Sequence, residues 1–130
     1  MTPGTVSFVN PLPFVKDMAR AVAFYRDVVG LTLVEDAGDF ARFEGGFALH
    51  DGAALHQAIF GDPPDNTDFG CKNIVLYFET EDLEQAYARI ATASRIIHPI
   101  QTQHWGGRVF RAYDPDGHIL EFGEPSTPQT

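Results

Sequence analysis

The sequence has little cysteine, no long apolar run and no recognisable export signal, and each shortage excludes a class of protein. The single cysteine, Cys71, cannot form a disulfide within the chain, which argues against a secreted disulfide scaffold. No apolar stretch approaches the roughly 20 residues that span a bilayer. Residues 1–10 lack a basic region followed by an apolar run. These absences predict a cytoplasmic protein with no membrane partner.

Basic residues are also scarce, at 9 Lys and Arg against 18 Asp and Glu, which gives a formal net charge of -9. Such an acidic chain is repelled by nucleic acid and by anionic membrane surfaces, so neither is expected as a partner. The sequence contains no Gly-x-Gly-x-x-Gly, no phosphate-binding Gly-x-x-x-x-Gly-Lys, no Gly-x-Ser-x-Gly and no Cys-x-x-Cys. The common nucleotide-binding and nucleophile motifs are therefore excluded.

The first half of the chain reads as a strand, a helix and three further strands. Residues 6–15 favour β structure, but two prolines restrict them to a short or edge strand. Asp17 is a typical N-cap for a helix over residues 18–29, and Gly30 is a typical helix stop. Three strands are predicted to follow, at residues 31–35, 40–43 and 47–50.

The second half repeats this order. A buried strand is predicted at residues 74–78, and Asp82 begins a helix as Asp17 does. Strands are then predicted at residues 96–100, 108–113 and 118–122. The chain thus divides into a first module (1–60), a linker (61–70), a second module (71–124) and a disordered tail (125–130), which together form one structural domain.

Three segments carry a resemblance to a known family. Residues 14–31 combine an apolar strand, a capping aspartate, a helix with Phe-Tyr and a Gly-Leu turn, and residues 77–83 look like a second opening of the same kind. The most specific segment is Asp-Pro-Asp-Gly at residues 114–117, followed by a strand that carries Glu121. Together they resemble the vicinal oxygen chelate superfamily of glyoxalases, bleomycin resistance proteins and extradiol dioxygenases.

The resemblance implies an α+β fold in which two tandem βαβββ modules form a cup-shaped mixed sheet around a cavity, with helices outside. It also implies a homodimer. In metal-dependent members, four inward positions can bind a divalent ion, which chelates the substrate as a Lewis acid. These positions fall on Asn10, His50, Val75 and Glu121, of which Val75 cannot be a ligand. The implied site is one iron, manganese, nickel or zinc ion on His50, Glu121 and Asn10, with Glu121 as the alternative catalytic base.

Strand alternation agrees that His50 and Glu121 face inward, because the large apolar neighbours of each fall on the opposite face. A metal-free His–Glu hydrogen bond is an equal alternative. Arg108 and Arg111 must point to opposite faces, and the inward one could hold a carboxylate or phosphate. The candidate pocket residues are Tyr77, Glu79, His104, Trp105, Arg108 and Arg111.

Two functions remain open. The first is a divalent-metal-dependent lyase, isomerase or dioxygenase that acts on a small dicarbonyl, hydroxy-keto or catechol-type compound. The second is a metal-free protein of the bleomycin-resistance type that binds and sequesters an aromatic or hydrophobic small molecule. Val75 at a ligand position and the 12% aromatic content favour the second function, whereas Glu121 and His50 favour the first. A protein that assists a partner enzyme, with no chemistry of its own, is a third and weaker possibility.

Overall fold

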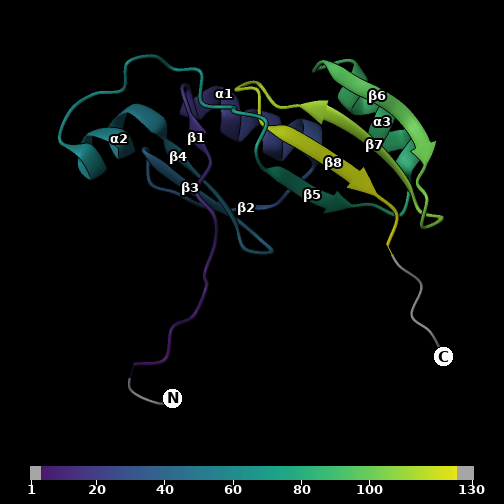
Figure 1. Cartoon of the computed structure of the whole chain (residues 1–130), viewed down its shortest axis with the longest axis horizontal. Helices are drawn as coiled ribbons and strands as arrows, with labels where there is room; N and C mark the ends of the chain where they lie inside the picture. The colour runs from purple at the N-terminus through teal and green to yellow at the C-terminus, as the bar shows by residue number, and fades with distance from the viewer. Residues whose placement is uncertain (1–3, 126–130) are drawn as a thin grey trace.

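The computed structural model of the protein describes residues 4–125, which form two four-stranded mixed sheets with the same strand order. The first sheet has the order β1-β4-β3-β2 and the second β5-β8-β7-β6 (Figure 1). In each sheet the first strand is parallel to the last and forms an edge. This repeated topology confirms the two βαβββ modules expected from the sequence.

The elements of the first half are β1 (Phe14–Val15), α1 (Met18–Ala23), η1 (Phe24–Val29), β2 (Leu33–Asp36), β3 (Phe40–Phe43), β4 (Phe47–Asp51) and α2 (Gly52–Phe60). Those of the second half are β5 (Val75–Glu79), α3 (Leu83–Ala91), β6 (Ile96–Thr102), β7 (Arg108–Tyr113) and β8 (Ile119–Gly123). Helix α2 is an addition to the predicted order. The predicted tail lies outside the described residues except for Pro125.

The caps of the first helix are those expected. The Asp17 side chain accepts a hydrogen bond from the Arg20 backbone N–H at 3.1 Å, and Gly30 ends the segment with φ at 96°. Between them the chain changes from an α-helix to the π-helix η1 at Phe24. Phe24 and the next residue, Tyr25, are both buried, and the wider π-helical turn accommodates two adjacent aromatic rings on the core side.

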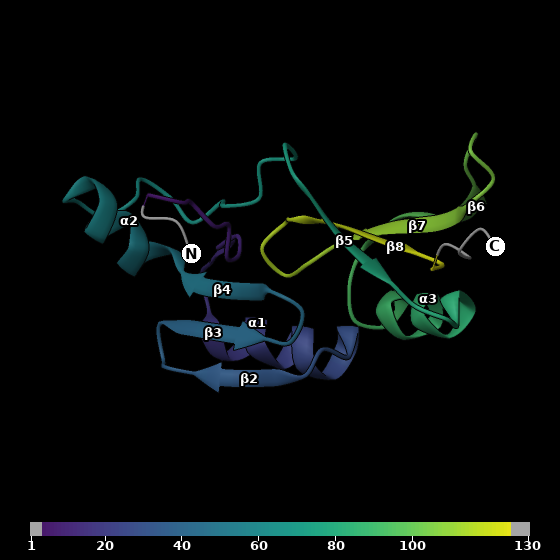
Figure 2. The same ribbon diagram turned by 90° about the horizontal axis from the view of Figure 1, so that it is seen from below.

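One apolar core is shared by both modules. The helices α1, η1 and α3 pack on the faces of the strands that carry the large apolar side chains (Figure 2). Strand alternation leaves the other face of each sheet for polar side chains. The largest fully buried core residues are Val15, Tyr25, Phe43, Leu49, Leu83, Ile90, Phe110 and Leu120.

The turn between β7 and β8 joins the two modules. The Tyr25 hydroxyl donates to Asp114 Oδ2 at 2.6 Å, and the Lys16 backbone N–H donates to Asp116 Oδ1 at 2.9 Å. The His118 ring lies with Nε2 2.8 Å from the Phe14 carbonyl oxygen. His118 is buried at this junction. Among the described residues, no helix is long and apolar enough to cross a membrane.

Candidate functional site

A row of polar side chains crosses the second sheet on the face opposite its helix. The strand registers align His98 with Arg111, Arg111 with Glu121, and Glu121 with Tyr77. The neighbours of these residues on β7 and β8, such as Leu120, point to the core instead. Four side chains from four different strands therefore meet on one surface.

Arg111 is the centre of this row. Its Nε donates to Glu121 Oε1 at 2.8 Å, and its Nη1 lies 3.0 Å from His98 Nε2. A guanidinium can only donate, so His98 Nε2 must be the acceptor. The hydrogen of the neutral imidazole is then on Nδ1, which lies 2.8 Å from the Pro99 carbonyl oxygen. The other guanidinium N–H groups of Arg111 remain able to bind an acceptor.

The Arg111–Glu121 pair is largely shielded from water, with side chains 26% and 16% exposed. Since the guanidinium neutralises the carboxylate and His98 is neutral, these three residues carry no net charge. Next to them, the Tyr77 hydroxyl donates to Glu79 Oε2 at 3.0 Å. Partial burial and the Glu79 carboxylate raise the pKa of Tyr77 above its usual value, so this hydroxyl stays protonated as a donor near neutral pH.

Arg108 faces away from this surface, as strand alternation predicted for one of the two arginines. It binds Glu84 of α3 and Glu124 at 2.7 Å each. The guanidinium lowers the pKa of both carboxyl groups. Of the two arginines, Arg111 is therefore the one that faces the candidate site.

The other predicted pocket residues, His104 and Trp105, lie in the exposed loop between β6 and β7. Their rings form an edge-to-face pair with centroids 5.0 Å apart, and Trp105 is 59% exposed. The loop reverses direction at Gly106, where φ is 96°. The two residues thus stand at the end of the sheet rather than in the polar row.

The residues proposed for a metal are spread over the fold. His50 lies on β4, with Nδ1 2.9 Å from the Asp51 carbonyl oxygen and its ring beside Phe40. Asn10 lies before β1, and its side-chain amide donates to the Pro11 carbonyl oxygen at 2.9 Å. The hydrogen bonds of His50 and Glu121 go to other groups and not to each other.

These placements test whether the donor set fits a divalent ion. Within residues 4–125, no three His, Cys, Asp or Glu side chains are grouped so that they could hold one. Glu121 forms an ion pair with Arg111. Val75, which occupies the ligand position that the resemblance implies on β5, is apolar. A catalytic metal usually has three protein ligands and one open position. The donors that a single chain brings together do not fit such a site.

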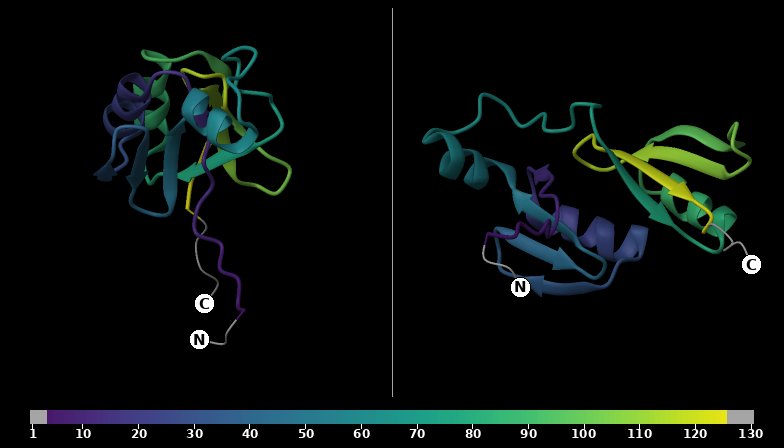
Figure 3. Two further views of the ribbon diagram at one scale, coloured as in Figure 1. Left: turned by 90° about the vertical axis from the view of Figure 1, so that its left-hand side faces the viewer. Right: turned by 60° about the horizontal axis from the view of Figure 1, so that its bottom comes forward.

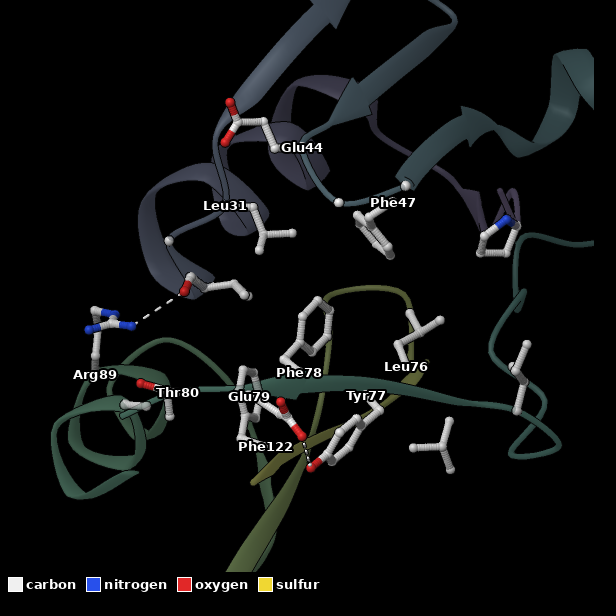
Figure 4. A pocket seen from close by; sticks show the side chains of 18 of the residues that line it. Leu31, Glu44, Phe47, Leu76, Tyr77, Phe78, Glu79, Thr80, Arg89 and Phe122 are labelled. Atoms are coloured by element: carbon white, nitrogen blue, oxygen red, sulfur yellow. Dashed lines mark hydrogen bonds between the residues drawn. The ribbon is translucent and has the colours of Figure 1, made fainter. Parts of the chain in front are cut away.

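A groove of about 1040 Å³ follows one side of β5. Residues 74–80 line it without interruption, and the turn before β4 lies opposite (Figure 4). Phe47 and Leu31 of the first module face Phe78 and Leu76 across it. Tyr77 and Glu79 lie at its lower border, where the groove meets the polar row.

His98 is the member of the row that sequence reasoning did not select. It falls inside the strand predicted at residues 96–100, but the pairing of β6 with β7 shifts on both sides of it. Pro99 has no N–H and cannot donate to the ladder, which fits an irregular register here. Simple alternation therefore could not assign the face of His98.

Comparisons with known proteins agree with this geometry. The protein-family model that describes the glyoxalase-like domain matches residues 8–127 of the chain. The paired βαβββ fold is that of the glyoxalase, bleomycin resistance and dioxygenase superfamily. The chain belongs to the glyoxalase-like domain family. No functionally curated protein matches the sequence.

Solved structures extend the comparison. A protein of unknown function from Agrobacterium tumefaciens is 47% identical, with a TM-score of 0.89, over 94% of this chain and 96% of that one. A glyoxalase/bleomycin resistance protein/dioxygenase from Nocardioides is 23% identical, with a TM-score of 0.70, over 98% and 93%. A lactoylglutathione lyase from Agrobacterium tumefaciens is 23% identical, with a TM-score of 0.64, over 95% of both chains. The two latter matches show a common fold.

Proposed function

We propose that the chain is a small-molecule-binding protein whose ligand lies on the polar row of the second sheet and is held without a divalent ion. The observation that carries the proposal is the Arg111–Glu121 ion pair at 2.8 Å. It places a guanidinium against the carboxylate that would otherwise be the strongest metal donor. The cation at the centre of the site is then a side chain of the protein itself.

The surroundings indicate the class of ligand. The N–H groups of Arg111 that remain free are directed donors, which suit a carbonyl or carboxylate oxygen. Val75 and Ile119 are paired in register on the same face and provide an apolar floor. A compound with a flat aromatic body and one acidic or carbonyl group fits both features. The proposal therefore favours the ligand-binding alternative over the metal-dependent enzyme.

The two arginines of β7 provide a matched experiment. The probe is 2-naphthoate, and its dissociation constant is measured by isothermal titration calorimetry. Loss of one charge-assisted hydrogen bond is worth about 1.5–3 kcal/mol, so Arg111→Gln should weaken binding by about 10- to 100-fold. Arg108→Gln removes the same charge from the opposite face and should leave the dissociation constant within about twofold.

Elemental analysis of the purified protein tests the metal-free part of the proposal. Binding of 2-naphthoate should be the same with and without a chelator, and Glu121→Gln should not change the metal content. The proposal fails if purified protein retains stoichiometric metal that the Glu121→Gln variant loses. In that case the oxygen-chelating enzyme would become the working model. Equal loss of affinity in both arginine variants would remove Arg111 from the site.

A further inference from the structure

A second cavity, here called the junction cavity, lies where the two modules and the linker meet. It has a volume of about 720 Å³, and its lining comes from α1, from linker residues 67–68 and from the turn at residues 114–117. The linker and this turn lie side by side (Figure 3), and the Gly70 N–H donates to the Asp116 carbonyl oxygen at 3.2 Å. The junction cavity includes no residue of the polar row and shares one border residue, Asp27, with the groove along β5.

Three basic side chains line the junction cavity, namely Lys16, Arg20 and Arg95. They come from both modules, because Lys16 and Arg20 lie at α1 and Arg95 lies just before β6. The whole chain has only 9 basic residues against 18 acidic ones. Nevertheless, none of these three forms an ion pair with a group of residues 4–125. The cavity therefore gathers cations that lack a partner in a chain that is otherwise acidic.

Four aspartates also line the cavity, but three of them are already bound within the protein. Asp114 is buried, and both of its carboxylate oxygens accept hydrogen bonds. Asp116 Oδ1 accepts the Lys16 backbone N–H at 2.9 Å, and burial raises the pKa of this carboxyl group. Asp27 pairs with the arginine before it at 2.8 Å. Within the described part of the chain, Asp68 is the one of the four whose carboxylate has no such partner. The three cations thus outnumber the free carboxylates.

The Arg95 guanidinium is positioned to bind an anion. Its Cζ lies 4.3 Å from the centroid of the Tyr113 ring, a cation–π contact that holds the group in place. Among residues 4–125, no oxygen acceptor binds its N–H groups, whereas Arg20 Nη2 donates to the Pro115 carbonyl oxygen at 3.2 Å. A guanidinium held in this way keeps its paired N–H donors available, and these match two oxygens of a phosphate group.

The size and lining of the cavity indicate the class of anion. A volume of about 720 Å³ is in the range of small-molecule sites and far exceeds that of a single phosphate ion. A phosphate monoester carries nearly two negative charges and three acceptor oxygens, so it can use three cations where a carboxylate cannot. Apolar and aromatic residues provide the rest of the lining for an organic group, namely Ala23, Phe24, Val28, Ala93 and Tyr113.

We propose that the junction cavity binds a small organic phosphate monoester, whose phosphate group is held by Lys16, Arg20 and Arg95 and whose organic part lies on the apolar lining. The ligand would contact both modules at once. Since it binds only where the modules are assembled, it should also stabilise the folded chain. The inference goes beyond the proposed function and does not require Arg111.

Phenyl phosphate is the probe, and its dissociation constant is measured by isothermal titration calorimetry at low salt, because salt screens exposed charges. Arg95→Gln and Arg20→Gln should each weaken binding by about 10-fold or more, the effect of one charge-assisted hydrogen bond. Lys72→Gln is the matched control, because Lys72 is an exposed cation that does not line the cavity. It should leave the dissociation constant within about twofold. Circular dichroism checks that each variant is folded.

Two further measurements test the details of the site. Asp68→Asn removes the free carboxylate and should tighten binding of phenyl phosphate by about two- to fivefold. Inorganic phosphate, which lacks the ring, should bind about 10-fold more weakly than phenyl phosphate. Equal affinity for the two probes would refute the organic part of the ligand. An unchanged or weaker affinity in Asp68→Asn would show that this carboxylate does not oppose an anion in the cavity.

Three results would overturn the inference as a whole: no binding of phenyl phosphate by the wild type, unchanged affinity in Arg95→Gln, or an equal loss in Lys72→Gln. The last result would mean that the probe responds only to the charge of the surface. The outcome is separable from that of the proposed function. Arg111→Gln should keep its affinity for phenyl phosphate, and Arg95→Gln should keep its affinity for 2-naphthoate.

Discussion

The hydrogen bond from Tyr25 to Asp114 offers the sharpest test of how the two modules are held together. The bond is 2.6 Å long, and both residues are buried, at 0% and 4% exposure. Asp114 Oδ1 also accepts the backbone N–H groups of Asp116 and His118, which fixes the turn. Tyr25→Phe removes one hydroxyl and keeps the aromatic packing. It leaves Asp114 Oδ2 without its partner in the core.

A hydrogen bond to a charged group contributes about 1.5–3 kcal/mol, so Tyr25→Phe should lower the free energy of unfolding by about 2 kcal/mol. For a domain of this size, about 4 °C of melting temperature corresponds to each kcal/mol, which gives a decrease of about 8 °C. Burial, the Asp114 carboxylate and its hydrogen bond all raise the pKa of Tyr25 well above its ordinary value. The folded protein therefore favours the protonated hydroxyl.

The sign of the pH dependence follows from that shift. Below pH about 10 the tyrosine is protonated in both states, and its contribution is complete. As the pH rises above about 10, the unfolded chain loses the proton more readily, and stability falls. In Tyr25→Phe, the free energy of unfolding should not show this decrease at alkaline pH.

Urea unfolding at neutral pH and at pH values above 10 measures both effects. Tyr87→Phe is the control, since its ring packs edge-to-face on Phe110 and its hydroxyl has no hydrogen bond within residues 4–125. The reasoning is refuted if Tyr25→Phe loses less than about 0.5 kcal/mol, which is the range of an ordinary surface substitution, or if Tyr87→Phe loses as much.

Three further predictions concern single positions. Arg89→Met removes donors 2.6 Å from the Val28 carbonyl oxygen and 3.3 Å from the next one; it should cost about 1–2 kcal/mol in urea unfolding, and no loss would show that these bonds do not hold α3 to η1. Gly30→Ala forces a side chain into φ of 96° and should cost about 1–2 kcal/mol; an unchanged denaturation midpoint would contradict it. Arg108→Gln breaks exposed ion pairs with Glu84 and a second carboxylate; calorimetry should find an almost unchanged melting temperature, because such pairs contribute little.

Local patterns predicted most of the fold because they report local physics. Asp17 and Asp82 both cap helices, and β7 has the bounds that the sequence analysis predicted. Helix α2 was not predicted because its sequence has no clear apolar face, and Phe60 at its end is 66% exposed. Its start at Asp51, which accepts the Ala54 N–H at 3.0 Å, was the available signal.

The candidate site was less accessible from sequence because it depends on pairing between distant strands. Strand alternation predicted that Arg108 and Arg111 point to opposite faces of the sheet. It could not show that Arg111 forms an ion pair with Glu121. That contact is fixed by the register of β7 with β8, and the contact with His98 by an irregular register with β6. Such registers are set by the whole sheet rather than by any short segment. The metal ligands inferred by resemblance stay a prediction that elemental analysis can test.

The turn at residues 114–117 has a consequence for how relatives of this protein are recognised. It is the most specific motif in the sequence, yet its side chains and backbone contact Tyr25, Lys16 and Arg20 of the other module. Linker residue Gly70 lies so close to Gly117 that no larger residue fits there. The motif therefore encodes assembly of the two halves. Shared possession of this motif therefore indicates a shared architecture. The motif does not include Arg111, the strand residue at the centre of the polar row.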